Sequence, residues 1–279
     1  MVKGNNLNHY EPIGITDDFM FFAVMSDEQI CTRLLQELLP ELKIKKVTTK
    51  AQSQIKGGRE DKAIRLDIQA FDERGRIYDI EMQLSRDFQP KRSRYYKALV
   101  DMTTLLAGTD YDDLPPMFVI IFSPFDQFGD KERVSDYIVY CPKTHRALGD
   151  GTHVIYVNSK GVNGKVSPTM QKFLDLMNGQ VDRNNALIND IAKKMDYYNH
   201  NQEWRANRLE YETTLRHEHK LGVDEGRKQG IDEGIYETTV KNALSVMVKF
   251  NVSAEQALDA LGVPKSDQPK YLQMMKEKV

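Results

Sequence analysis

The stretch of residues 64–85, IRLDIQAFDERGRIYDIEMQLS, predicts two β-strands joined by a tight turn. Side chains alternate between an apolar and a mixed face over residues 64–71 and again over residues 77–85. A period of two on both sides of a glycine-containing turn is typical of a β-hairpin. Gly75 stands where a three-residue loop requires a left-handed residue. Residues 73–75 are therefore expected to form the loop.

That loop sets a register in which Asp67 lies directly opposite Glu81, and Gln83 lies opposite Arg65. Like charges that face each other destabilise a sheet, and Asp79 adds a third carboxylate to the same face. A hard divalent cation such as Mg²⁺ would offset the repulsion, because it prefers carboxylate oxygens and keeps waters for chemistry. The alternative is a half-exposed hairpin whose polar face is neutralised by Arg65.

The spacing of these residues resembles a known nuclease motif. Asp67, thirteen intervening residues and Glu81-Met82-Gln83 resemble the Asp…Glu-x-Lys/Gln core of the PD-(D/E)XK nuclease superfamily. More narrowly, residues 65–87 resemble its recombination-promoting nuclease or transposase branch, in which the last motif position is commonly glutamine. The segments TDDFMFFAVM (residues 16–25) and RSRYYKALV (residues 92–100) resemble two further blocks of that branch. With the charged, glycine-punctuated tail, the resemblance extends over nearly the whole chain.

The resemblance implies an α/β fold of the restriction-endonuclease type, with a mixed sheet flanked by helices and an all-helical C-terminal extension. It also implies an Mg²⁺-dependent endodeoxyribonuclease that hydrolyses DNA phosphodiester bonds in recombination or mobile elements. Asp67 and Glu81 would hold Mg²⁺ or Mn²⁺, helped by the carbonyl of Met82. Asp18 matches an acidic position of the N-terminal block and would complete the metal shell. The alternative is that Asp18 only complements the dipole of its helix.

Gln83 replaces the lysine that is usual in the superfamily. That lysine orients or activates the attacking water and neutralises charge, whereas the amide of Gln83 can only orient. The charged task would pass to Arg65, to Lys62 or to a second metal ion. A catalytically weak or inactive nucleic-acid-binding module is therefore an alternative function. A scaffold that assembles partners through its helical tail is a third.

Further elements are predicted by periodicity and by capping residues. Helices are expected over residues 16–39, 91–108 and 167–178, and strands over residues 44–55, 117–123, 134–141 and 153–158. Thr16 or Asp17 is a suitable N-cap for the first helix. The run MFVIIFS, residues 117–123, is apolar throughout, which is typical of a strand buried on both faces.

The helix expected after Pro90 carries basic and aromatic residues together. This mixture, beside a carboxylate site, suits a phosphate backbone. The alternative is a solvated basic face with the tyrosines in the core. We expect the following residues to contact the DNA backbone: Arg65, Arg92, Arg94, Tyr96 and Lys97.

From Val181 onward the chain is expected to be almost entirely helical, which predicts a nuclease-like domain over residues 1–180 and a helical region over residues 181–279. Within that region glycine recurs at every fourth position, at Gly222, Gly226, Gly230 and Gly234. Each glycine inside a helix costs about 1 kcal/mol relative to alanine. Close approach of a second helix would explain them, as would a frayed linker. We favour the former, which predicts a homo-oligomer.

Composition limits the remaining possibilities. The net charge is −2, so a DNA-binding surface must be a local patch rather than a global basic field. Two cysteines make neither a disulfide framework nor a metal cluster, which favours a cytoplasmic setting. The polar N-terminus lacks the apolar core of a signal peptide, and no apolar run predicts a membrane span.

Overall fold

The computed structural model describes residues 11–55, 64–86 and 90–277, apart from the side chains of residues 51–55, 64–67, 215, 218 and 277. The chain divides into two compact units, one that extends to Arg205 and one that runs from Ala206 to Val279.

The first unit is built on a six-stranded mixed sheet with the order β1-β2-β3-β4-β6-β5. The strands are β1 (Val47–Ile55), β2 (Ile64–Asp72), β3 (Ile77–Met82), β4 (Met117–Ser123), β5 (Val134–Tyr137) and β6 (Thr152–Asn158). β1, β2 and β3 are antiparallel neighbours, whereas β3, β4 and β6 run parallel. β5 is an edge strand antiparallel to β6. All seven residues of β4 are buried, as the apolar run predicts.

The hairpin of β2 and β3 has the predicted register. Ile68 pairs with Ile80, and Phe71 pairs with Ile77. Gly75 in the turn has a φ of 76°, the left-handed conformation that the three-residue loop requires. Both strands continue beyond the Ile68–Ile80 pair towards the motif residues.

A buried carboxylate fixes this turn. Asp72 accepts hydrogen bonds from Arg76 Nε at 2.5 Å and from the Tyr78 hydroxyl at 2.8 Å. It also accepts the backbone N–H groups of Arg74 and Arg76, while Arg76 donates to the carbonyl of Leu42 at 2.9 Å. Burial alone would raise the pKa of Asp72, but the bonds from Tyr78 and Arg76 hold that pKa below its usual value.

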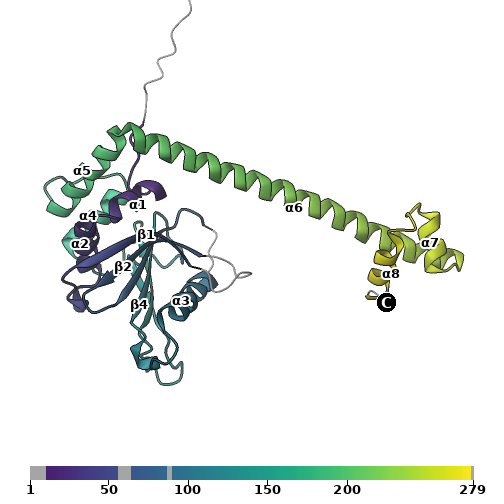
Figure 1. Ribbon diagram of the computed structural model, residues 1–279, viewed down its shortest axis with the longest axis horizontal. Helices are drawn as coiled ribbons and strands as arrows, with labels where there is room; N and C mark the ends of the chain where they lie inside the picture. The colour runs from purple at the N-terminus through teal and green to yellow at the C-terminus, as the bar shows by residue number, and fades with distance from the viewer. Residues whose placement is uncertain (1–10, 56–63, 87–89, 278–279) are drawn as a thin grey trace, which may run out of the picture. The chain divides into compact units, whose positions relative to one another are not determined.

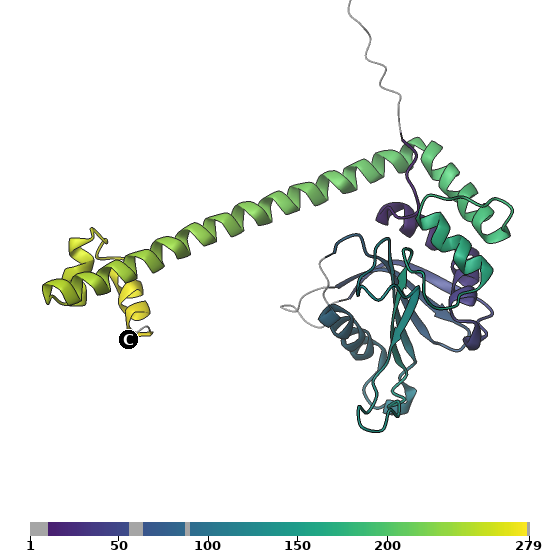
Figure 2. The ribbon, with the colours of Figure 1, turned by 180° about the vertical axis from the view of Figure 1, so that it is seen from behind.

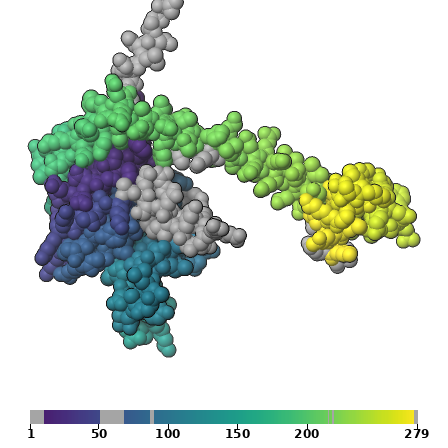
Figure 3. Space-filling model, viewed as in Figure 1, coloured from purple at the N-terminus to yellow at the C-terminus, as the bar shows by residue number. Residues whose placement is uncertain are grey.

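Helices cover both faces of the sheet (Figures 1 and 2). One face is covered by α1 (Asp18–Met25), α2 (Glu28–Leu38), α4 (Pro168–Met177) and α5 (Ala186–His200). The other face is covered by α3 (Pro90–Thr104), which buries Tyr96, Leu99 and Val100 against it. Two short 3₁₀ helices, η1 (Pro40–Leu42) and η2 (Tyr111–Asp113), lie in the connections. In Figure 3 the purple segment of α1 and α2 packs against the green segment of α5.

The prediction of a single helix over residues 16–39 is wrong, because the segment forms two helices, α1 and α2. Asp17 caps α1 by accepting the N–H of Met20 at 2.9 Å. Asp27 then caps α2 by accepting the N–H groups of Gln29 and Ile30 at 3.0 and 3.2 Å. Because a cap residue has an extended backbone, Asp27 ends one helix and begins the next.

Other expected boundaries also change. β1 begins at Val47 rather than at residue 44, and β3 ends at Met82 rather than at residue 85. β5 ends at Tyr137 rather than at residue 141, because the following segment closes a turn with its own backbone hydrogen bonds around Cys141. α3 ends at Thr104, four residues before the expected Gly108.

The border expected at residue 180 falls before α5. Leu187, Ile188 and Ile191 of that helix are fully or almost fully buried in the core of the first unit. Trp204 also packs there, with its ring centroid 5.2 Å from that of Phe19. The first compact unit therefore extends beyond the expected border to Arg205.

The second unit contains most of α6 (Gln202–Phe250), together with α7 (Ala254–Ala260) and α8 (Gln268–Glu277). Its small core consists of Val240, Ala243, Ala257, Leu258, Tyr271 and Met275. A Cβ atom built on any of the four periodic glycines would meet no atom within 4 Å. Among the described residues, no helix is long and apolar enough to cross a membrane.

Candidate active site

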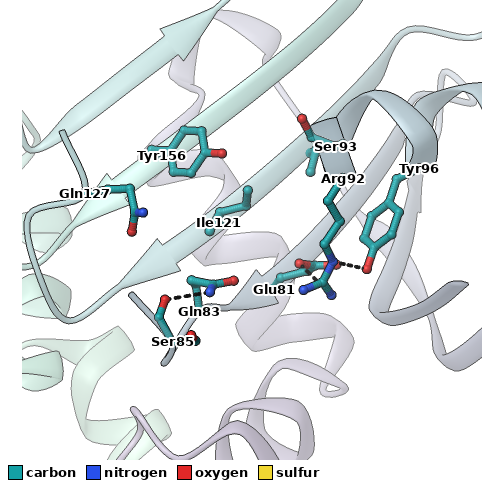
Figure 4. A pocket seen from close by; sticks show the side chains of 10 residues that line it. Glu81, Gln83, Ser85, Arg92, Ser93, Tyr96, Ile121, Gln127 and Tyr156 are labelled. Carbon is teal, nitrogen blue, oxygen red and sulfur yellow. Dashed lines mark hydrogen bonds and ion pairs between the residues drawn. The ribbon is translucent and has the colours of Figure 1, made fainter. Parts of the chain in front are cut away.

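A cavity of about 150 Å³ lies between the beginning of α3 and the sheet (Figure 4). Its polar lining comes from the end of β3, from α3, from the segment after β4 and from β6. The lining residues are Glu81, Gln83, Ser85, Arg92, Ser93, Tyr96, Val119, Ile121, Gln127 and Tyr156.

The sheet register places Glu81 in this cavity. Glu81 of β3 pairs with Ile121 of β4, and Ile121 pairs with Tyr156 of β6. Residues paired across parallel strands share one face of the sheet. Because neighbouring strands are about 4.8 Å apart, Glu81 and Tyr156 stand about 10 Å apart in one row.

Arg92 faces the buried carboxylate of Glu81. The Arg92 guanidinium lies 3.5 Å from Glu81 Oε2, and the Glu81 side chain is only 6% exposed. Arg92 Nε also donates a hydrogen bond to the Tyr96 hydroxyl, and the guanidinium lies 4.9 Å from the centre of the Tyr96 ring. Arg92 and Tyr96 are one helical turn apart, so α3 presents them side by side.

The hydroxyl of Tyr96 keeps its proton at neutral pH. Burial raises the pKa of Tyr96 to about 12, and the negative charge of Glu81 acts in the same direction. Burial and the neighbouring Tyr137 and Glu81 likewise raise the pKa of Tyr156 to about 12. Both phenols are therefore neutral hydrogen-bonding groups rather than bases.

Asp79 is a second buried carboxylate on the same face of the sheet as Glu81. It lies two residues before Glu81 on the same face of β3, is fully buried, and pairs across the hairpin with Gln69. Burying two carboxylates so close together is costly unless positive charge or hydrogen bonds compensate it.

Gln83 follows the end of β3 and lines the cavity. Its backbone N–H donates to the carbonyl of Phe122 at 2.8 Å, which extends the parallel pairing by one residue. Its side-chain Nε2 donates to the carbonyl of Ser85 at 2.7 Å. The amide is therefore oriented by the neighbouring backbone (Figure 4).

Residues 16–204, well over half of the chain, match the family model of the PD-(D/E)XK nuclease family transposase. The chain belongs to this family. The mixed sheet flanked by helices is consistent with the restriction-endonuclease-like fold of PD-(D/E)XK proteins. No curated protein matches the chain, and no solved structure matches it.

The donor set suits the divalent metal ions that PD-(D/E)XK nucleases generally use. Glu81 and Asp79 offer carboxylate oxygens, which hard cations prefer. Among the side chains that the structure describes, no three histidine, cysteine or acidic residues are grouped closely enough to hold a metal ion. The motif identified in the sequence adds the aspartate of β2 as an expected third carboxylate.

That aspartate, Asp67, lies within β2, but its side chain is outside the described part of the chain. The β2–β3 pairing reaches Ile68 opposite Ile80, and Asp67 and Glu81 are the next residues of the two strands, so their predicted pairing lies one step beyond it. Arg65 also lies in β2, where it pairs with Gln54, and its side chain is likewise undescribed. Lys62 lies outside the described residues.

Three other predicted site residues do not line the cavity. Asp18 begins α1, on the opposite face of the sheet, and accepts the N–H of Phe19 at 2.8 Å. Arg94 is exposed on α3. Lys97 donates to the Thr152 hydroxyl at 3.3 Å, at the far end of the strands from Glu81.

The sequence alone did not indicate Ser93, Gln127 or Tyr156 as site residues. Ser93 lies one position after Arg92 and is buried against the cavity. Tyr156 lies within a run of buried residues of β6, so only the parallel register of β3, β4 and β6 would have identified it. Gln127 lies in a connection and carries no periodic signal.

Proposed function

We propose that this chain is a metal-dependent DNA endonuclease that hydrolyses phosphodiester bonds. The observation that carries the proposal is the buried carboxylate of Glu81, on a hairpin of the motif's register, with the guanidinium of Arg92 3.5 Å away. Family membership supports a nuclease and a DNA substrate. The link to recombination or mobile elements rests on the family description alone.

In this proposal Glu81 and Asp67 hold Mg²⁺ or Mn²⁺, with the backbone carbonyl of Met82 nearby. Asp79 lies on the same face and is a further candidate ligand, whereas Asp18 would have to reach the site from the other side of the sheet. A bound divalent ion would supply a Lewis acid and an activated nucleophile.

Arg92 provides positive charge that Gln83 lacks. Its side chain is half exposed, so an incoming phosphate can reach the guanidinium. The hydrogen bond from Arg92 Nε to the Tyr96 hydroxyl orients the guanidinium. A guanidinium fixed in this way matches the geometry of phosphate oxygens and stabilises the charge that develops as the phosphodiester bond breaks. Gln83 would contribute only by orienting the attacking water.

Plasmid cleavage tests the proposal. The purified chain is incubated with supercoiled plasmid and Mg²⁺ or Mn²⁺, beside Asp67→Ala, Glu81→Ala and the control Glu41→Ala, an exposed carboxylate of η1. The parent and Glu41→Ala should nick the plasmid only when metal is present, and the two motif variants should not. Equal nicking by all four proteins would mean that the activity does not come from this site.

A catalytically inactive DNA-binding module on the same fold is the second candidate. The observation in its favour is the Gln83 side-chain amide, which is uncharged and donates to the backbone carbonyl of Ser85. This candidate predicts salt-dependent DNA binding that is unchanged in Glu81→Ala and unaffected by a chelator. Metal-dependent cleavage that is lost in Glu81→Ala excludes it.

A further inference from the structure

Beyond the cavity, three aromatic rings gather on the same face of the sheet. Tyr156 meets Phe128 and Tyr137 edge to face, at centroid distances of 4.9 and 5.9 Å. Phe128 and Tyr137 are 5.2 Å apart. Tyr156 also lines the cavity at Glu81, so this aromatic cluster and the cavity are continuous.

The strand order places Tyr137 on the edge strand β5, and Phe128 packs against it. Ser135 of the edge strand β5 pairs with Tyr156, and Tyr137 pairs with Val154. The helix α3 comes closest to β1 and β4, and among the described residues its buried side chains reach Val154 and Tyr156 of β6 but no residue of β5. Phe128 and Tyr137 consequently remain 37% and 44% exposed, whereas Tyr156 is 9% exposed.

The loop that carries Phe128 is fixed by its own hydrogen bonds. Asp126 accepts the backbone N–H groups of Gly129 at 2.9 Å and Lys131 at 3.1 Å. Asn163 Nδ2 donates to the carbonyl of Asp130 at 2.9 Å, which ties the loop to the segment after β6. The rings are therefore held in place before any ligand binds, which lowers the entropic cost of binding.

Gln127 adds a polar group to the cavity that Tyr156 and Glu81 also line. Its Oε1 is buried and, among the described residues, has no hydrogen-bond partner. A buried acceptor without a partner is costly, and a ligand that donates to it removes that cost. Figure 4 shows Gln127 beside Tyr156, across the cavity from Arg92 and Tyr96.

The charges around the cluster indicate which part of a nucleic acid it would contact. The loop carries Asp126, Asp130 and Glu132 against Lys131 and Arg133, so it has no excess of positive charge for phosphates. Aromatic rings instead stack on bases, and amides bond base edges. The faces of bases inside a duplex are already stacked, so only unpaired bases can use such a surface.

We infer that the aromatic cluster and Gln127 bind unpaired bases of the DNA strand whose phosphate lies at Glu81, so that the preferred substrate contains a single-stranded segment. This inference rests on the proposed nuclease function and specifies its substrate class. The strand would run from Glu81 across β4 and β6 to the edge strand β5.

Fluorescence anisotropy of the full chain in EDTA tests the inference without cleavage. Labelled single-stranded and duplex oligonucleotides are compared for the parent, Phe128→Ala, Tyr137→Ala and the control Tyr111→Ala, an exposed aromatic residue of η2. Each cluster variant should bind the single strand about tenfold more weakly, the lower part of the range for one lost base stack. Duplex binding, and both affinities of Tyr111→Ala, should change less than twofold.

Two additional variants separate stacking from folding. Phe128→Trp and Tyr137→Trp keep a flat ring, so they should retain the single-strand affinity of the parent. Because stacking involves no phosphate, the tenfold loss should persist as salt is raised.

Equal losses for single strand and duplex, or no loss in either alanine variant, would overturn the inference. The parallel plasmid assay keeps the two ideas distinct. Metal-dependent nicking that requires Glu81, together with equal binding of both DNA forms, removes this inference alone. If the alanine variants lose single-strand binding and Glu81→Ala nicks plasmid as fast as the parent, only the proposed endonuclease function is excluded.

Discussion

Asp72→Ala should lower the free energy of unfolding of the first unit by about 3–5 kcal/mol. The side chains of Asp72 and Arg76 are 0% and 8% exposed, so solvent screens their 2.5 Å contact very little. The substitution removes the charged hydrogen bond with Arg76, which is worth about 1.5–3 kcal/mol. It also leaves the buried Tyr78 hydroxyl without its acceptor, at a cost of about 1–3 kcal/mol. The sum agrees with the cost of leaving one member of a buried ion pair alone.

Urea denaturation followed by tryptophan fluorescence measures this loss. Trp204 is the only tryptophan in the sequence, and it packs in the first unit with its ring 5.3 Å from that of Tyr198. The double variant Asp72→Ala/Arg76→Met should be more stable than Asp72→Ala, because no buried charge is then left alone. A loss below about 1 kcal/mol in Asp72→Ala, or a double variant less stable than it, would refute the reasoning.

Three other outcomes are expected. Arg92→Ala should lower the rate of metal-dependent nicking about 10²- to 10³-fold, the usual cost of losing one donor to developing charge. Arg92→Lys should recover only part of that rate, because an ammonium lacks the planar guanidinium donors that contact Tyr96 and a phosphate together. Arg74→Ala, which changes an exposed arginine, is the control. Alanine at the four periodic glycines should stabilise α6 by about 1 kcal/mol each, since each Cβ has open space. If α6 self-associates through that face, light scattering should show a smaller assembly, and an unchanged oligomer contradicts that role. The stabilising contribution of Asp72, whose pKa is lowered on folding, should be present above the unfolded-state pKa of about 4 and decrease as pH falls through the folded-state pKa. The urea midpoints of parent and Asp72→Ala should therefore approach each other as pH is lowered below about 4, and a constant difference would contradict the assignment.

The hairpin could be predicted because alternation and loop length together leave one register. Gly75 and the three-residue loop fix which residues pair, and the observed pairs from Ile68–Ile80 to Phe71–Ile77 agree. The break between α1 and α2 was missed because apolar residues occur on both sides of it, at Met20–Met25 and again from Ile30 to Leu35. Asp27, which caps α2, was the available signal.

The candidate site could be predicted only where local periodicity determines it. Arg92 and Tyr96 are four residues apart on α3 and reach the cavity together, whereas Arg94 and Lys97 point elsewhere because they lie on other sides of the helix. Tyr156 and Gln127 come from distant segments, and only the assembled sheet brings them to Glu81.

Because α5 and Trp204 pack in the core of the first unit, they determine where the chain can be truncated without exposing that core. A chain shortened at residue 180 would lose Leu187, Ile188 and Ile191 and would uncover the apolar surfaces of α1, α2 and α4. A chain shortened after Arg205 would keep that hydrophobic layer intact, and the family match ends at almost the same residue. Arg205 is therefore the natural junction for a chimera in which one nuclease unit receives a different tail.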